Sequence, residues 1–282
     1  MANKPIILSD NLLDDAVLHP SHVVSLNAVT EVEGQELFRV ADNLRDVTSF
    51  TIQQVAADCL VNVDCGVPVA PDTLIYDRGH NWLGHPSSVS YSDDGAGWTD
   101  IVGWNLPTVA GGLPAGASGV LTPDGVWWAR WTPQAHRYWR VWFAPVGGVS
   151  PRITGLYLGQ SYRLPEYLDA PGAYDYRRNH KVLKNEVSQG GVRVKRRILN
   201  FSEIDLALRL EAEDYEQFHP HVARLMDYNQ PWWFCLDDST ETGAGMMRLY
   251  QLPGDTVYDP VVNPVHREVR LLLEEVIPAL TI

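Results

Sequence analysis

Residues 88–101 read SVSYSDDGAGWTDI and carry the pattern that decides the fold of the first half of the chain. Val89 and Tyr91 alternate with serines, which is the period-2 pattern of a strand with one buried face. The turn Asp93–Gly95 follows, and Trp98 then leads into a second, returning strand. The stretch therefore predicts a β-hairpin.

The two aspartates of this turn allow two interpretations. Paired carboxylates can bind calcium or transfer protons, but Asp-Gly is also a preferred hairpin turn, because Asp tolerates the left-handed backbone and bonds its own turn amides. A calcium loop needs a longer series of oxygen ligands at regular spacing, and none follows. We therefore expect a structural corner of a β-sandwich, with Trp98 packed in its core.

The rest of the first half has short strands separated by Gly, Pro, Asn and Asp, which is typical of a β-sandwich. In RYWRVWF, residues 137–143, the alternation places one set of side chains on each face of a strand, namely Trp139, Val141 and Phe143 against Tyr138, Arg140 and Trp142. One face must be core, because each large ring buries roughly 150 to 250 Å². The other face is either an interaction surface or a second buried layer under the Gly/Pro-rich stretch 106–125.

The pattern changes after residue 158. Residues 192–199 and 204–210 indicate strands, and three further strands are expected at 231–237, 246–252 and 268–276. Between them, residues 211–230 have apolar side chains at helical spacing, with Pro220 as a kink or as the true start. The sequence therefore predicts a mainly β fold: a jelly-roll β-sandwich with an N-terminal arm over residues 1–158, then a smaller α+β domain with one main helix over 159–282.

Composition narrows the classes of function. The chain has 282 residues and a formal net charge of −13, so it lacks the basic surface that general nucleic-acid binding requires. No apolar run approaches the roughly 20 residues of a membrane span, and no signal peptide is recognisable. Cys59, Cys65 and Cys235 lack disulfide or metal spacing, so we interpret them as small core residues of a protein made in a reducing cytosol.

No motif for catalysis stands out. The chain contains no Gly-rich phosphate loop, no Gly-x-Ser-x-Gly elbow and no Cys/His zinc spacing. We therefore expect no catalytic residues, no metal site and no cofactor. His219 and His221 lie two apart, a spacing at which a helix points them in different directions.

Two groups of residues are candidates for contact with a glycan or a protein partner. The first is a polar and aromatic loop, YDRGHNWLGHP, with His80, Asn81, Trp82 and His85; the alternative is an exposed loop anchored by its tryptophan. The second group is Trp128 and Arg130, on the opposite face of their strand from Trp127, Ala129 and Trp131.

Residues 177–197 contain eight Lys and Arg residues against a single acidic one, the only basic island in an acidic chain. It is either a solvated hairpin with charged edges or a docking arm for an acidic neighbouring subunit. The candidate interface residues are Arg177, Arg178, Lys181, Lys184, Arg193, Lys195, Arg196 and Arg197. A copy of the same chain offers the complementary surface, for example the acidic start of the predicted helix.

Residues 40–158 resemble the discoidin family, also called galactose-binding-like domains. The matching elements are ADNLRD, LVNVDCG, VSYSDDGAGWTDI, HRYWRVWF and ITGLYLG, in the family's order. The resemblance implies a β-sandwich whose end loops bind glycans, lipids or proteins. The His/Arg clamp of fucose-binding members is missing, so sugar binding is not implied.

The second half resembles the belt-type domain of distal tail and minor tail proteins of tailed phages, on the strand, helix and aromatic strand at residues 202–238 and the long hairpin before them. The sandwich precedes the belt here, which reverses the family's usual order. The two resemblances together imply a structural protein of a phage tail tip or baseplate, made in the host cytoplasm and carried in the virion. Its partners would be other tail proteins and copies of itself in a ring. The alternative is a carbohydrate-binding module for a host-surface glycan, and a more distant one is an accessory domain of a glycan-degrading enzyme.

Overall fold

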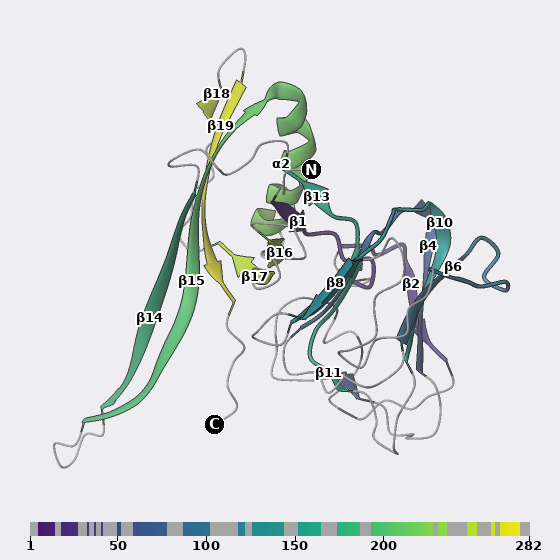
Figure 1. Cartoon of the computed structure of the whole chain (residues 1–282), viewed down its shortest axis with the longest axis horizontal. Helices are drawn as coiled ribbons and strands as arrows, with labels where there is room; N and C mark the ends of the chain where they lie inside the picture. Colours follow the sequence, from purple (N-terminus) through teal and green to yellow (C-terminus); the bar gives the residue numbers. More distant parts are fainter. Residues whose placement is uncertain are drawn as a thin grey trace.

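The computed structural model describes residues 5–14, 18–27, 33, 37, 41, 50–51, 59–77, 87–101, 118–121, 126–143, 152–164, 174–186, 193–227, 231–235, 247–252, 261–262 and 266–276. The fold is mainly β, as the sequence predicts, with a β-sandwich and a second sheet that is covered by a helix (Figure 1).

The first sheet of the sandwich has five antiparallel strands in the order β2-β4-β10-β6-β7. Their bounds are Val23–Leu26, Cys59–Val69, His136–Phe143, Ser87–Ser92 and Thr99–Asp100. The second sheet has the order β12-β5-β9-β8, with the bounds Leu156–Gly159, Thr73–Tyr76, Trp127–Arg130 and Ser118–Leu121. A two-stranded pair, β3 (Phe50–Thr51) with β11 (Arg152–Ile153), accompanies them.

The core of the sandwich lies between these two sheets and follows the predicted alternation. Trp139, Val141 and Phe143 of β10 are fully buried in it, together with Val61 and Val63 of β4. Tyr91 is partly buried and packs against the same core. The predicted core face of the RYWRVWF strand is therefore confirmed.

Trp98 is not in this core, contrary to the prediction. Asp100 of β7 pairs with Ser90 of β6, which pairs with Arg140 of β10. Trp98 lies two residues before Asp100 and is partly exposed, and the Arg140 guanidinium stands 3.7 Å from the centroid of its ring. The tryptophan is thus on the outer face of the sheet, because the turn that precedes it sets the register of the returning strand.

The large sheet has eight strands and combines residues from distant parts of the sequence. Its order is β13-β1-β16-β17-β19-β15-β14, with β18 beside β19. In this order the bounds are Tyr162–Arg163, Ile6–Leu8, Trp232–Cys235, Arg248–Gln251, His266–Glu275, Arg193–Glu211 and Tyr174–Glu186, and β18 is Val261–Val262. The N-terminal arm, which the sequence grouped with the sandwich, therefore supplies a strand to the sheet of the second half.

Helix α2 (Ala212–Asp227) covers one face of this sheet. Its buried residues Phe218, Val222 and Leu225 recur at helical spacing and pack on β15 and β19 (Figure 1). Acidic Glu213 and Asp214 lie in its first turn, where they favour the positive end of the helix dipole. The helix begins well before Pro220, so this proline is not its start.

Strands β14 and β15 form a long hairpin that projects away from the rest of the molecule (Figure 1). The two strands separately expected at 192–199 and 204–210 are one strand, β15, of 19 residues. β15 pairs with β19 over residues 203–211 and with β14 over residues 193–206, so the basic residues lie on the projecting part of the hairpin.

A third apolar cluster joins the sandwich to the large sheet. It contains Ile75, Trp128 and Tyr157 of the sandwich, and it continues into β1, β16 and β17 of the large sheet. Both faces of β9 are therefore buried: one packs inside the sandwich and the other against the large sheet. The three cysteines are free and buried, as predicted.

Candidate binding face of the sandwich

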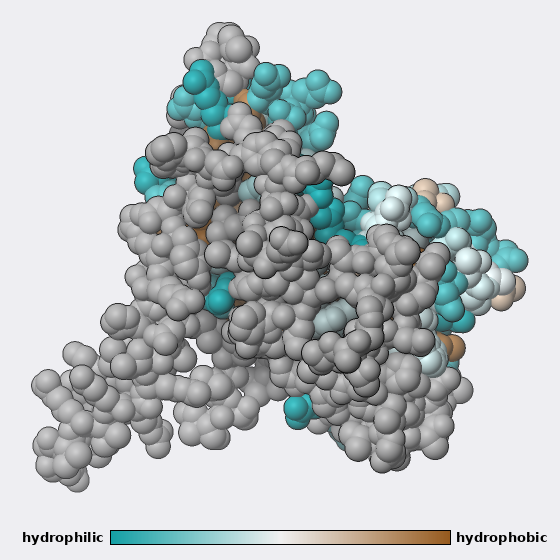
Figure 2. Space-filling model, viewed as in Figure 1, coloured by the Kyte–Doolittle hydropathy of each residue, from teal (hydrophilic) through white to brown (hydrophobic). Residues whose placement is uncertain are grey.

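The outer face of the five-stranded sheet carries a row of polar side chains across all of its strands. The pairing register aligns Ser25, Asn62, Arg140, Ser90 and Asp100, in that order. Apart from the buried Ser90, these residues are partly or fully exposed. Figure 2 shows the described surface around β4, β6 and β10 as mainly hydrophilic. A sheet face of this composition can offer several hydrogen bonds to one ligand.

Aromatic rings flank this row along β10. Tyr138 and Trp142 stand two residues to either side of Arg140, on the same face, and both are partly exposed. Consecutive residues on one face of a strand are about 7 Å apart, so the two rings are separated by about 13 Å. Trp142 offers flat apolar surface on one side of the polar row. On the other side the Tyr138 ring is partly covered, because the Arg137 guanidinium lies 4.8 Å from its centroid and Gly95 packs beside it.

Two interactions hold the side chain of Arg140. Its Nε donates a hydrogen bond to Oδ1 of Asn62 at 2.6 Å, and its guanidinium stacks on Trp98. Burial lowers the pKa of Arg140, which stays charged because an arginine pKa lies so far above neutrality.

Asp64 and Arg137 form an ion pair at the side of the row. The Nε and Nη2 atoms of Arg137 donate to the two carboxylate oxygens of Asp64 at 2.7 and 2.8 Å. The hydrogen bond from Arg137 is the main cause that lowers the pKa of Asp64. The pair keeps both charges neutralised beside the aromatic rings.

The turn at Asp93–Gly95 is built as the sequence predicts. One carboxylate oxygen of Asp94 accepts hydrogen bonds from the backbone amides of Ala96 and Gly97 and from the hydroxyl of Ser92, at 2.8 to 2.9 Å. These bonds lower the pKa of Asp94 to about 2. Gly95 has a φ of +74°, which favours glycine, while Asp93 pairs with His136.

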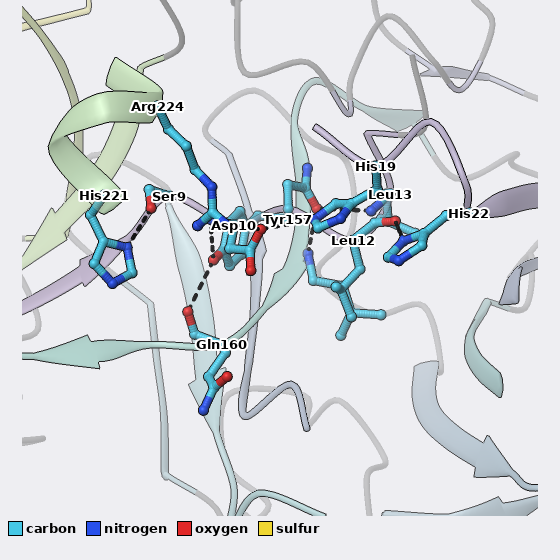
Figure 3. A network of polar contacts seen from close by, with 12 residues as sticks. Ser9, Asp10, Leu12, Leu13, His19, His22, Tyr157, Gln160, His221 and Arg224 are labelled. Carbon is cyan, nitrogen blue, oxygen red and sulfur yellow. Dashed lines mark hydrogen bonds and ion pairs between the residues drawn. The ribbon is translucent and has the colours of Figure 1, made fainter. Parts of the chain in front are cut away.

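A second polar cluster lies at the junction of the sandwich and the large sheet (Figure 3). Ser9 Oγ and Nδ1 of His221 are 2.7 Å apart, while Asp10 contacts His19 at 2.8 Å and Arg224 at 3.1 Å. A small pocket of roughly 160 Å³ beside it is lined by Asp10, Gln160, Ser161, Tyr162 and His221.

This junction cluster differs from a nucleophile–base–acid relay. The carboxylate of Asp10 engages His19 and Arg224, so it does not orient His221 behind Ser9. Burial lowers the pKa of His221 to about 4, which leaves the ring neutral at physiological pH. His19 also stacks on His22, with ring centroids 4.2 Å apart. The contacts of Ser9 and Asp10 with His221 and Arg224 hold helix α2 against the segment that follows β1.

Of the residues predicted as glycan or partner contacts, the structure describes Trp128 and Arg130. Trp128 is 0% exposed, so it is not available to a ligand, because the large sheet covers its face of β9. Arg130 lies 3.7 Å from Asp72 and donates to Ser161 Oγ, which are local contacts near the junction. His80, Asn81, Trp82 and His85 lie outside the described residues.

The predicted interface residues all lie in the β14–β15 hairpin. Their backbone is placed in β14 and β15, and their side chains are outside the described part. The residues are Arg177, Arg178, Lys181, Lys184, Arg193, Lys195, Arg196 and Arg197. Within the described residues, no group of three or more His, Cys, Asp or Glu side chains is arranged to hold a metal ion, and no helix is long and apolar enough to cross a membrane.

Solved structures with a similar fold include carbohydrate-binding modules and a lectin domain. The carbohydrate-binding module CBM32-1 of a family 31 glycoside hydrolase from Clostridium perfringens is 14% identical over 50% of this chain and 96% of its own, with a TM-score of 0.39. A chitosan-binding module of a chitosanase/glucanase from Paenibacillus sp. IK-5 is 14% identical over 52% and 97%, with a TM-score of 0.37. The lectin domain of lectinolysin, solved with Lewis B antigen, is 10% identical over 55% and 99%, with a TM-score of 0.38.

These modules span about half of the present chain. At such low identities and TM-scores the likeness carries no conclusion about a ligand. No family model and no curated protein matches the sequence.

Proposed function

We propose that this chain is a non-enzymatic binding protein whose sandwich binds a saccharide on the outer face of its five-stranded sheet. The observation that carries the proposal is the juxtaposition of partly exposed Tyr138 and Trp142 with the polar row through Arg140. This is the carbohydrate-binding alternative of the sequence, placed on a sheet face rather than on the end loops.

Saccharides suit such a face for two reasons. The C–H faces of sugar rings are apolar and pack on flat aromatic side chains, while their hydroxyls need several hydrogen-bond donors and acceptors. Trp142 supplies the ring, and Asn62, Arg140 and Asp100 supply donors and acceptors of both kinds. The side chains stand on paired strands, so little ordering is needed when a ligand binds.

Trp142→Ala is expected to weaken saccharide binding at least about tenfold, which corresponds to about 1.4 kcal/mol. The reason is the loss of the stacking surface. The full chain is first screened against immobilised neutral and acidic polysaccharides. Titration calorimetry with the best ligand then measures the affinity of each variant. Met226→Ala is the control, because it removes an exposed apolar side chain from α2, which packs on the large sheet and not on the five-stranded sheet. Equal affinities of the two variants would remove the sheet face from consideration.

We also propose that the second half assembles the protein with copies of itself, as in a phage tail tip or baseplate. The specific observation in favour is the projecting β14–β15 hairpin, in which a 13-residue and a 19-residue strand carry the basic island away from an acidic body (Figure 1). The start of α2 supplies a complementary surface, since Glu211, Glu213 and Glu216 are exposed there.

Reversal of Arg193, Lys195, Arg196 and Arg197 to Glu is expected to weaken self-association and to leave each subunit folded. Exposed ion pairs contribute only about 0 to 1 kcal/mol each, so the effect requires the whole cluster. Light scattering on the purified chain at low and high salt measures it, and circular dichroism checks the fold. An oligomer that resists both the reversal and the salt would show that the hairpin is a solvated edge.

A further inference from the structure

The guanidinium of Arg140 is held in place without an ion pair among the described residues. Its two contacts among the described residues are the hydrogen bond from Nε to Asn62 and the stacking on Trp98. The amide oxygen of Asn62 is a neutral acceptor, and a ring face takes no hydrogen bond from the edge of the guanidinium. Both Nη groups therefore keep their N–H donors available on the outer face of the sheet.

Other arginines of the described residues are paired differently. Arg137 binds both carboxylate oxygens of Asp64, and Arg270 binds both oxygens of Asp205, at 2.6 to 3.0 Å. Arg248 contacts both oxygens of Glu275 at 2.9 Å through Nη1 alone. The planar guanidinium of Arg137 and of Arg270 matches its carboxylate in a two-point geometry. Arg140 differs because no described carboxylate occupies this position on it.

The negative charges around Arg140 leave room for an anionic ligand. Asp64 is already neutralised by Arg137, and Asp100 lies at the edge of the sheet with Ser90 between it and Arg140. The Asp100 carboxylate accepts a hydrogen bond from Ser90 Oγ, and its charge acts on Arg140 in the direction that raises the pKa of the guanidinium. Asp100 therefore offsets part of the charge of Arg140, but among the described residues no carboxylate forms an ion pair with it.

We propose that Arg140 receives an anionic group of the saccharide, a carboxylate or a sulfate, so that the ligands of this face are acidic saccharides. This inference rests on the proposed saccharide-binding function. Asn62 and Trp98 act as positioning residues, because they fix the plane of the guanidinium before the ligand arrives. A carboxylate and a sulfate share the required chemistry, which is two oxygens that accept parallel N–H bonds.

The experiment compares four polymers against the full chain. Polygalacturonate carries carboxylates, and its fully methyl-esterified form has the same backbone without the charge; dextran sulfate and dextran form the matched pair for sulfate. We expect at least about tenfold tighter binding to the anionic member of one pair. The basic residues of the β14–β15 hairpin also attract polyanions, although the chain carries a net charge of −13, so the variants below are needed to assign the preference to Arg140.

Three variants test whether the preference for the anionic polymer depends on Arg140. Arg140→Gln is expected to remove the preference for the anionic polymer, and Arg140→Lys to reduce it, because lysine keeps the charge but lacks the planar fork. Arg270→Gln makes the same change of net charge on the large sheet, at an exposed side chain, and is expected to keep the preference. A preference lost equally in Arg140→Gln and Arg270→Gln would overturn the assignment.

The outcomes separate this inference from the proposed function. If charged and uncharged polymers bind equally and Trp142→Ala weakens both, saccharide binding stands and the anionic subsite is overturned. If no polymer binds, both are overturned. A preference within the carboxylate pair or within the sulfate pair that Arg140→Gln removes supports the subsite and identifies its anionic group, and a preference that Arg140→Gln keeps overturns it. The melting temperature of each variant shows whether a loss of binding follows from unfolding.

Discussion

Trp128→Ala is expected to lower the free energy of unfolding by about 3 to 5 kcal/mol, the range for removing a buried large aromatic side chain. Trp128 is 0% exposed and belongs to the cluster that joins the sandwich to β1, β16 and β17. Its indole N–H has no hydrogen-bond partner among the described residues, so packing accounts for its contribution. The cavity left by alanine would lie between the two parts of the molecule and weaken their contact.

Trp142→Ala is the matched control for this loss, because the same side chain is removed from a partly exposed position in β10, which belongs to the other sheet of the sandwich. Urea unfolding followed by circular dichroism measures both variants, and Trp142→Ala is expected to cost about 1 kcal/mol or less. A Trp128 variant as stable as the Trp142 variant would contradict the interface. A transition that splits into two would show that the parts unfold separately once the interface is weakened.

The sequence predicts the parts of the fold that depend on local alternation. In β10 the period of two separates Trp139, Val141 and Phe143 from the residues that face outward, and the structure confirms this division. The hairpin turn at Asp94 is also predictable, because an aspartate that bonds its own turn amides needs no distant partner. Both features depend on residues close together in the chain.

Contacts between segments that are distant in the sequence cannot be predicted from local alternation. Alternation in β9 divides Trp127 from Trp128, but it does not show that a second sheet covers the Trp128 face. β1 pairs with β16 through Ile6 and Cys235, which are more than 200 residues apart in the sequence, and no local pattern indicates this pairing. The position of Trp98 also depends on a contact between strands. Large apolar side chains are usually in the core, but the register of β7 places this one beside Arg140.

The candidate binding face was only partly predictable. The alternation along the strand identifies Tyr138, Arg140 and Trp142 as one face, with an interaction surface and a second buried layer as equal alternatives. The structure leaves these side chains partly exposed and adds Asn62 and Trp98, which come from a different strand and from a turn. The cross-strand register that assembles them is a property of the folded sheet, so the position of the Arg140 guanidinium requires the structure.

Asn11→Leu is expected to destabilise the protein by about 2 to 5 kcal/mol, although leucine has a similar size and is more apolar. The side chain of Asn11 is 0% exposed. Its Nδ2 donates to the carbonyl oxygens of Ala41 and Leu156 at 2.7 and 3.0 Å, and its Oδ1 accepts from the amides of Leu158 and Leu13 at 3.0 and 3.4 Å. One side chain thus ties the segment after β1 to β12 and to Ala41.

Leucine removes these bonds and leaves backbone groups buried without partners, each of which costs about 1 to 3 kcal/mol when unsatisfied. The apolar gain from leucine offsets part of this loss, since burying such a side chain contributes about 1.5 to 3 kcal/mol. Asn62→Leu is the control, because that asparagine is partly exposed and its described side-chain bond is the one to Arg140. Urea unfolding of both variants gives the comparison, and the Asn62 variant is expected to lose about 1 kcal/mol or less. Equal stabilities would mean that the buried bonds of Asn11 contribute no more than an exposed contact, and the N-terminal segment would then be held by apolar packing alone.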